Sequence, residues 1–165
     1  MPVQIRKILF ATDLSENARH AFRYAAFMAD RFDAKITMLH VIDDLSTTGI
    51  SMLIDYVGEE KWAAIRKERE KGFRDSIRKN IGSFCEDMSK DLHGCPFIVE
   101  NTVIREGNPA VEILAEAEKP EYDMVVMGTQ GYGLVTGAII GNTARKVVRR
   151  CTKPVTVIRM PSKDS

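Results

Sequence analysis

The sequence predicts an α/β fold: an open five-stranded parallel sheet, doubly wound, with helices on both faces. Short apolar runs of strand length alternate with amphipathic helical patterns along the whole chain. The run at 124–127 is apolar throughout, which is typical of a strand buried on both faces. Parallel strands in one sheet are joined by right-handed crossovers, so we expect helices to cover both sides.

Composition narrows the class of protein. The chain has 165 residues, 44% of them hydrophobic, which suits one domain over 1–160 and a disordered tail at 161–165. A formal net charge of +1 gives no field that attracts nucleic acid or an anionic membrane. The 3 cysteines lack the spacing of a metal-binding motif. The N-terminus turns polar too soon for a signal peptide, and no apolar run is long enough to span a bilayer. We therefore expect a soluble cytoplasmic protein.

The first strand and helix are clearly marked. An apolar strand at 8–11 ends at Thr12 and Asp13, and Ser15 is placed to cap the helix that follows. A second strand spans 34–42. The apolar positions of the helix between them fall on one face: Ala18, Ala21, Phe22, Ala25, Met28, Ala29 and Phe32.

Residues 43–60 follow no period, which predicts an irregular excursion at the carboxyl edge of the sheet. A long charged helix over 59–92 comes next, although Gly72 and Gly82 are weak helix formers within it. We expect this helix to bury one stripe of side chains: Trp62, Ile65, Phe73, Ile77, Ile81, Phe84, Met88 and Leu92.

The second half repeats the alternation. A third strand at 97–105 leads to Asn108, a predicted helix cap, and Pro109, which suits a first helical position. This helix continues to Pro120. A fourth strand then ends at Gly128, a last helix runs over 141–150, and a fifth strand spans 154–160.

A glycine-rich stretch links the fourth strand to the last helix. Gly128, Gly131, Gly133 and Gly137 precede a helix start near Gly141, where unpaired main-chain N–H groups suit an anion such as phosphate. The stretch is not an NTPase phosphate loop, because the chain contains no Gly-Lys pair, and its spacing differs from the Rossmann fingerprint by one residue. A generic turn is the competing interpretation.

Doubly wound sheets bind ligands at the carboxyl ends of their strands, where strand order reverses. If the first and fourth strands are neighbours, Asp13 faces the glycine loop, an arrangement that suits a nucleotide; the alternative is that Asp13 only caps a helix. His40 has no second ligand at metal spacing and is interpreted as structural. The last helix carries four cations: Arg145, Lys146, Arg149 and Arg150. We interpret them as a solvated face that the helix dipole favours; the alternative is a patch that binds nucleic acid.

The chain resembles a universal stress protein over essentially its whole length. Part of the resemblance lies in three short segments: Ala11-Thr12-Asp13 with Val41 further on, Gly107-Asn108-Pro109, and Lys153-Pro154-Val155. The most specific part is a late signature, which in ATP-binding members reads Gly, two residues, Gly, nine residues, Gly, then Ser or Thr. Here it reads Gly128, Gly131, Gly141 and Asn142. Asn142 departs from the pattern, and Thr143 is the nearest hydroxyl that can take over the missing role.

The resemblance implies sheet order 3-2-1-4-5, a homodimer through the last strand, and a bound adenine nucleotide (ATP, ADP or AMP), with any Mg²⁺ held mainly by the phosphates. It implies that Asp13 and Val41 meet the adenosine, with Ala11 and Thr12 beside them. The residues implied to line the ribose and phosphates are Met127, Gly128, Thr129, Gly131, Gly141, Asn142 and Thr143.

Catalysis is not expected beyond slow ATP hydrolysis. The sequence places no general base with an orienting partner, no Ser-His-Asp arrangement and no arginine clamp for phosphoryl transfer. The leading hypothesis is an ATP-binding, nucleotide-dependent regulatory switch of the stress response. The alternative is an interaction module that binds no nucleotide and acts through its dimer surface and the 43–60 excursion.

Overall fold

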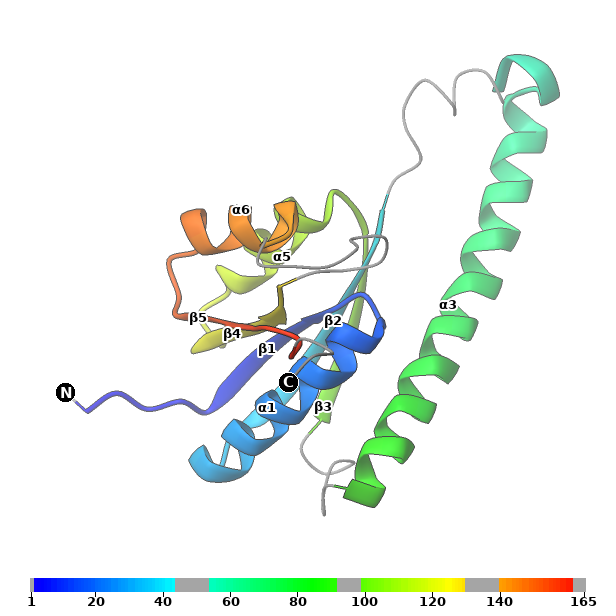
Figure 1. Cartoon of the computed structure of the whole chain (residues 1–165). Coiled ribbons are helices and arrows are strands. Elements are labelled where there is room, and N and C mark those ends of the chain that lie inside the picture. The colour runs from blue at the N-terminus through cyan, green and yellow to red at the C-terminus, as the bar shows by residue number, and fades with distance from the viewer. Residues whose placement is uncertain (1, 44–53, 92–98, 130–139, 162–165) are drawn as a thin grey trace.

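The computed structural model describes residues 2–43, 54–91, 99–129 and 140–161. Figure 1 shows strands and helices alternating around one sheet. The elements are β1 (Lys7–Thr12), α1 (Glu16–Phe32), β2 (Lys35–Asp43), α3 (Glu59–Asp91), β3 (Val99–Gly107), α5 (Pro109–Ala117), β4 (Met124–Gly128), α6 (Asn142–Arg150) and β5 (Val155–Ile158). A further helical turn lies at 54–57. Every predicted strand and helix is present.

The sheet has the order β3-β2-β1-β4-β5 and its strand pairs are parallel, which confirms the predicted fold class and strand order. β1 lies at the centre. Its Ala11 is in register with Leu39 of β2 on one side and with Met127 of β4 on the other. Successive strands are added on one side of β1 as far as β3, and then on the other side. The order therefore reverses between β1 and β4, the place where such sheets bind ligands.

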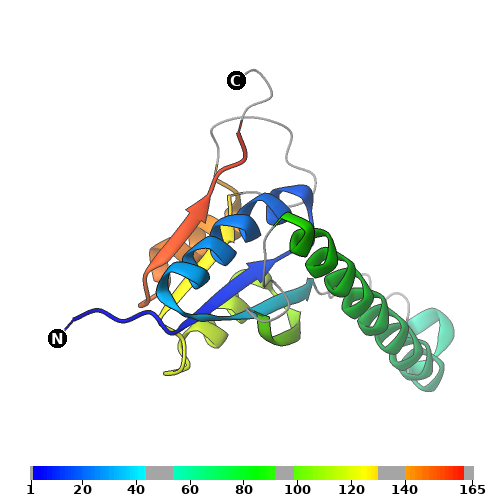
Figure 2. The same cartoon turned by 90° about the horizontal axis from the view of Figure 1, so that it is seen from below.

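Alternate side chains of the strands build a core on each face of the sheet. Ile8 and Phe10 belong to the core beneath α1 and α3, where the Phe10 ring meets the Phe22 ring of α1 with centroids 5.2 Å apart. Leu9 and Ala11 belong to the opposite core, beneath α5 and α6. Figures 1 and 2 show these two helix layers on either side of the sheet. The doubly wound arrangement is confirmed.

Helix α3 has 33 residues and continues through both of its glycines. Phe84 anchors it: this side chain is 1% exposed, its ring centroid lies 5.0 Å from that of Phe22, and Arg19 of α1 sits over it while pairing with Asp87 at 3.2 Å. The predicted buried stripe is confirmed at Phe84 but wrong at Ile65, which is 41% exposed. α3 is almost twice as long as the 17-residue α1, so α1 cannot cover its whole length. The stripe side chains Phe73, Ile77, Ile81, Met88 and Leu92 lie outside the described part of the structure.

Several element boundaries differ from the predicted ones by a few residues. β3 ends at Gly107 because its pairing with β2 continues as far as Asp43. β5 ends at Ile158, which pairs with Gly128, the last residue of β4. Both predicted helix caps are confirmed: Ser15 Oγ accepts from Ala18 N at 3.2 Å, and Asn108 Oδ1 accepts from Val111 N at 3.3 Å. Residues 44–53 of the predicted excursion and 162–165 of the predicted tail lie outside the described part.

A buried carboxylate joins α5 to the start of β4. Glu116 is 3% exposed, and its oxygens accept hydrogen bonds from Lys119 Nζ at 2.9 Å, Tyr122 Oη at 2.9 Å and Arg105 Nη2 at 3.1 Å. Burial alone would raise the pKa of Glu116, but these three donors outweigh it and hold that pKa below its usual value. Burial and the bond to Glu116 both raise the pKa of Tyr122. Glu116 is therefore ionised at neutral pH and fixes the turn that precedes β4.

Candidate functional site

The ends of β1 and β4 lie side by side at the carboxyl edge of the sheet. Ala11 and Met127 are in register and are 7% and 6% exposed, so the two strands deliver Thr12 and Gly128 to the same level of the edge. α1 then begins on one face of the sheet, and α6 begins on the other. The end of β1, which Asp13 follows, and the end of β4 therefore lie at the same edge of the sheet.

The turn after β1 is held by its own side chains. Thr12 Oγ1 accepts from Leu14 N at 3.0 Å, and Asp13 Oδ1 accepts from Ser15 N at 3.0 Å and from the Ser15 hydroxyl. Leu14 adopts φ = 65°, a left-handed conformation that is strained for a leucine and is maintained by these bonds. Asp13 therefore supports the cap of α1, as the simpler of the two sequence interpretations expects.

A main-chain hydrogen bond joins Thr129 and Gly141, described residues on either side of the predicted glycine loop. Thr129 N donates to Ile158 O of β5 at 3.0 Å, and Thr129 O accepts from Gly141 N at 2.7 Å. Gly141 is thus fixed beside the end of β4, where it serves as the cap residue of α6. The loop residues 130–139, including the predicted binding residue Gly131, lie outside the described part.

The start of α6 differs from the starts of α1 and α5. Ser15 and Asn108 cap those two helices with side-chain oxygens, whereas Gly141 has no side chain to offer. Asn142 is exposed and Thr143 half-buried in the first turn of α6. The sequence of α6 contains no acid. Its first main-chain N–H groups, which carry the positive end of the helix dipole, have no carboxylate beside them within the helix, and such an end suits an anion.

Two residues of the site were not recognised as such from the sequence. His40, beside Thr12 in the sheet, has its Nδ1 at 2.9 Å from Thr12 O, so this nitrogen carries the proton and the ring braces the end of β1. Arg145, which the pattern indicated only as part of a solvated face, donates from Nη2 to Asn142 Oδ1 at 3.4 Å. Its position three residues after Asn142 was a usable signal, because such residues are neighbours on a helix. Val41 of β2 packs against the core beneath α5 and α6.

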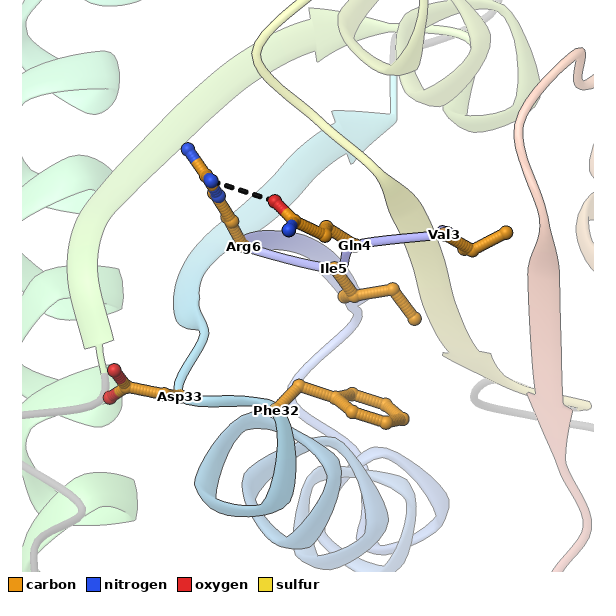
Figure 3. Close-up of a pocket in the computed structure, with 6 residues that line it drawn as sticks. All are labelled: Val3, Gln4, Ile5, Arg6, Phe32 and Asp33. Carbon is orange, nitrogen blue, oxygen red and sulfur yellow. Dashed lines mark hydrogen bonds between the residues drawn. The ribbon is translucent and has the colours of Figure 1, made fainter. Parts of the chain in front are cut away.

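The described residues offer no metal cluster, and a groove in the structure lies away from this edge. Among the residues that the structure describes, no group of three or more His, Cys, Asp or Glu side chains could hold a metal ion. A groove of about 490 Å³ lies near the amino end of β1. The residues that line it, drawn in Figure 3, are Val3, Gln4, Ile5, Arg6, Phe32 and Asp33. It contains none of the predicted site residues.

Comparison with protein families gives a match over nearly the whole chain. The model of the universal stress protein family matches residues 4–159. Universal stress protein MJ0531 of Methanocaldococcus jannaschii is 28% identical over 159 residues, which cover 96% of this chain and 85% of that protein.

In the helices of the described part, no stretch is long and apolar enough to cross a membrane.

Solved structures agree with the fold. The structure of MJ0577, a universal stress protein of the same organism, superposes with a TM-score of 0.71 at 25% identity, covering 98% of this chain and 100% of that one. A universal stress protein solved in complex with cAMP gives a TM-score of 0.55 at 14% identity, covering 94% of this chain and 97% of that one. At that identity, the second likeness is evidence for the fold alone.

Proposed function

The chain belongs to the universal stress protein family, and from this premise we propose that it is an adenine-nucleotide-binding switch. The nucleotide, ATP in the leading case, would lie at the carboxyl edge between the end of β1 and the start of α6. Its regulated output would be a change of partner or assembly and not turnover. Phosphate release above the level of contamination is not part of the proposal.

One observation carries the proposal: the start of α6, which has no side-chain cap, is hydrogen-bonded to the end of β4 at the point where strand order reverses. The bond from Gly141 N to Thr129 O fixes this helix start, and the absence of acids in α6 leaves its positive end available to phosphate. The topology of the sheet independently selects the same edge.

In this proposal each predicted binding residue would have a role. Asp13 and Val41 would meet the adenosine, beside Ala11 and Thr12 at the end of β1. Mg²⁺, where present, would be held mainly by phosphate oxygens. The residues that would hold the ribose and phosphates are Met127, Gly128, Thr129, Gly131, Gly141, Asn142 and Thr143.

The test is to denature freshly purified protein, identify the released small molecules by mass spectrometry, and then titrate the emptied protein with ATP, ADP, AMP and cAMP by calorimetry. cAMP is included because a protein of the same fold was solved with it. A released adenine nucleotide, or saturable binding of an added one, supports the proposal. An empty protein that ignores every added nucleotide overturns it and supports an interaction module instead.

We extend the proposal to a homodimer through β5. This strand lies at the end of the sheet order, and its four residues are only partly buried, so its outer edge is free to pair within the limits of the described chain. Light scattering coupled to size-exclusion chromatography should give twice the 18.5 kDa mass of one chain. A monomeric mass at micromolar concentration would reject the dimer without touching the nucleotide proposal.

A further inference from the structure

The first ten residues of α3, 59–68, form a helical segment with little burial. Every side chain in this segment is exposed except that of Trp62, which is half-buried. Figures 1 and 2 show this end of α3 at the outside of the molecule, and the anchor Phe84 lies about 24 Å beyond the segment along the helix axis. A helix this short is marginally stable in water without tertiary packing, so the segment depends on the rest of α3 or on a partner.

An apolar face with charges along its flank runs through this segment. Trp62 and Ile65 are three residues apart and therefore share one face of the helix, where Ile65 is 41% exposed. Lys61 and Glu68 are exposed and seven residues apart, which places both on one flank of that face, two turns from each other. These four residues occupy positions a, d and g of a heptad, the pattern by which two helices pair.

The other flank faces the sheet. Arg66 has its Nη2 3.7 Å from Oε2 of Glu106 near the end of β3, and 58% of the Arg66 side chain is still exposed. Glu59, seven residues earlier, shares this flank. The flank that carries Lys61 and Glu68 therefore points away from the sheet, and a second helix can approach the apolar face from that side.

The charges of the segment complement a second copy of the same segment in antiparallel orientation. When Trp62 of each copy packs on Ile65 of the other, Lys61 of each copy faces Glu68 of the other. A parallel pair would instead bring Lys61 close to Arg66 of the other copy. These are like charges, which disfavour the parallel orientation.

We propose that residues 59–68 of α3 dock on the same segment of a second copy of this chain as an antiparallel helix pair. On the flank nearer the sheet, Glu59 of each copy then faces Arg66 of the other, which adds a second set of opposite charges. The two Phe84 anchors lie about 60 Å apart along the pair, so the two sheets lie toward its opposite ends. The contact is separate from β5 and from the nucleotide site, and it does not depend on the proposed function.

The size of the contact predicts its strength. Ten residues from each copy are fewer than the roughly 20–30 residues a side of a standard stable interface, so the association is weak and transient. It should therefore appear only as the protein concentration rises, on top of any pairing through β5.

The experiment uses two charge reversals on the exposed flank, Lys61→Glu and Glu68→Lys, and the matched control Lys67→Glu. Lys67 is an exposed cation of the same segment, two residues after Ile65 and so on a different face of the helix. Sedimentation equilibrium of the full chain, from about 1 µM to about 1 mM protein, measures self-association of each protein and of an equimolar mixture of the two reversals. Circular dichroism checks that each variant keeps its helix content.

We expect the mass of the wild type to rise twofold over this range. Each reversal alone should weaken this step about 10-fold, because like charges then face each other on both sides of the pair. The equimolar mixture should restore it, since a Lys61→Glu chain and a Glu68→Lys chain present opposite charges to each other at both contacts. Lys67→Glu should change it less than about 2-fold.

Three results overturn the proposal: a wild-type mass that stays constant over the range, reversals that associate as the wild type does, or a mixture that associates no better than either reversal alone. Each of them leaves the β5 dimer and the nucleotide proposal untouched, because Lys61 and Glu68 belong to neither site.

Discussion

Replacing Asn142 with Asp should have two opposite effects at the start of α6: the negative charge should stabilise the helix and should weaken the binding of phosphate. Asn142→Asp alters no shape, because the two side chains are isosteric. A negative charge in the first turn favours the helix dipole by about 0.3–1 kcal/mol, which raises the melting temperature by roughly 1–4 °C in a chain of this size. The same charge repels a phosphate held at that turn. At a separation of about 5 Å the repulsion per unit charge is about 0.8 kcal/mol with the dielectric constant of water and about 3 kcal/mol with an effective value of 20.

These energies predict a loss of ATP affinity between about 4-fold and about 200-fold in a protein that is more stable than the wild type. The assays are calorimetric titration with ATP and thermal unfolding without nucleotide. Asn142→Ser is the neutral control at the same position, and because it supplies the hydroxyl of the family signature it should bind ATP at least as tightly as the wild type. If Asn142→Asp is stabilised yet binds ATP as well as the wild type does, the phosphates are not at the start of α6 and our reasoning about this edge is refuted.

Other changes test the loop, the packing of α3 and the buried carboxylate. Gly131→Val should abolish nucleotide binding in a folded protein, because it fills the approach to the phosphates; an unaltered affinity would place the phosphate site elsewhere. Phe84→Ala should lower the free energy of unfolding by about 3–5 kcal/mol in urea titrations, since it removes the ring that packs on Phe22, and a loss under about 1 kcal/mol would show that α3 is not anchored there. Glu116→Gln should cost about 1–3 kcal/mol at pH 7, as three donors lose an ionised acceptor. The pKa of Glu116 is lower in the folded protein than in the unfolded chain, so the stability that its ionised form contributes is present above the usual pKa of 4.5 and is lost as pH falls through the folded pKa. The difference in the free energy of unfolding between the wild type and Glu116→Gln should therefore shrink between pH 7 and pH 3, and a constant difference would contradict this account.

The sequence predicted the strands, the helices and the caps at Ser15 and Asn108 because these features depend on local patterns and local hydrogen bonds. Strand order came from the resemblance, since periodicity does not say which strands pair. The error at Ile65 has the same origin: a helical period shows which side chains share a face, but not how far a neighbouring helix extends to cover them. Ile65 lies on the predicted stripe and is still 41% exposed.

The edge at which the predicted site residues lie was predicted, and the contacts at that edge were not. The ends of β1 and β4 were expected to be neighbours, and they are, because the two strands pair in parallel and their carboxyl ends lie at one edge. The closure of the loop through Thr129 depends on main-chain atoms whose partners are set by tertiary structure, so no side-chain pattern signals it. Arg145 was interpreted only as a cation favoured by the helix dipole, and its contact with Asn142 depends on a rotamer that spacing alone does not fix.

The position of Thr129 has a mechanical consequence. One residue is hydrogen-bonded through its nitrogen to Ile158 on the outermost strand and through its oxygen to Gly141 at the first turn of the last helix. A displacement of β5 by even 1 Å would stretch the first bond beyond hydrogen-bonding range unless Thr129 followed, and Thr129 would then pull on the second. If a second subunit pairs with β5, its arrival and the filling of the nucleotide site both act on one residue, Thr129, and any factor by which one event alters the equilibrium constant of the other applies equally in the reverse direction.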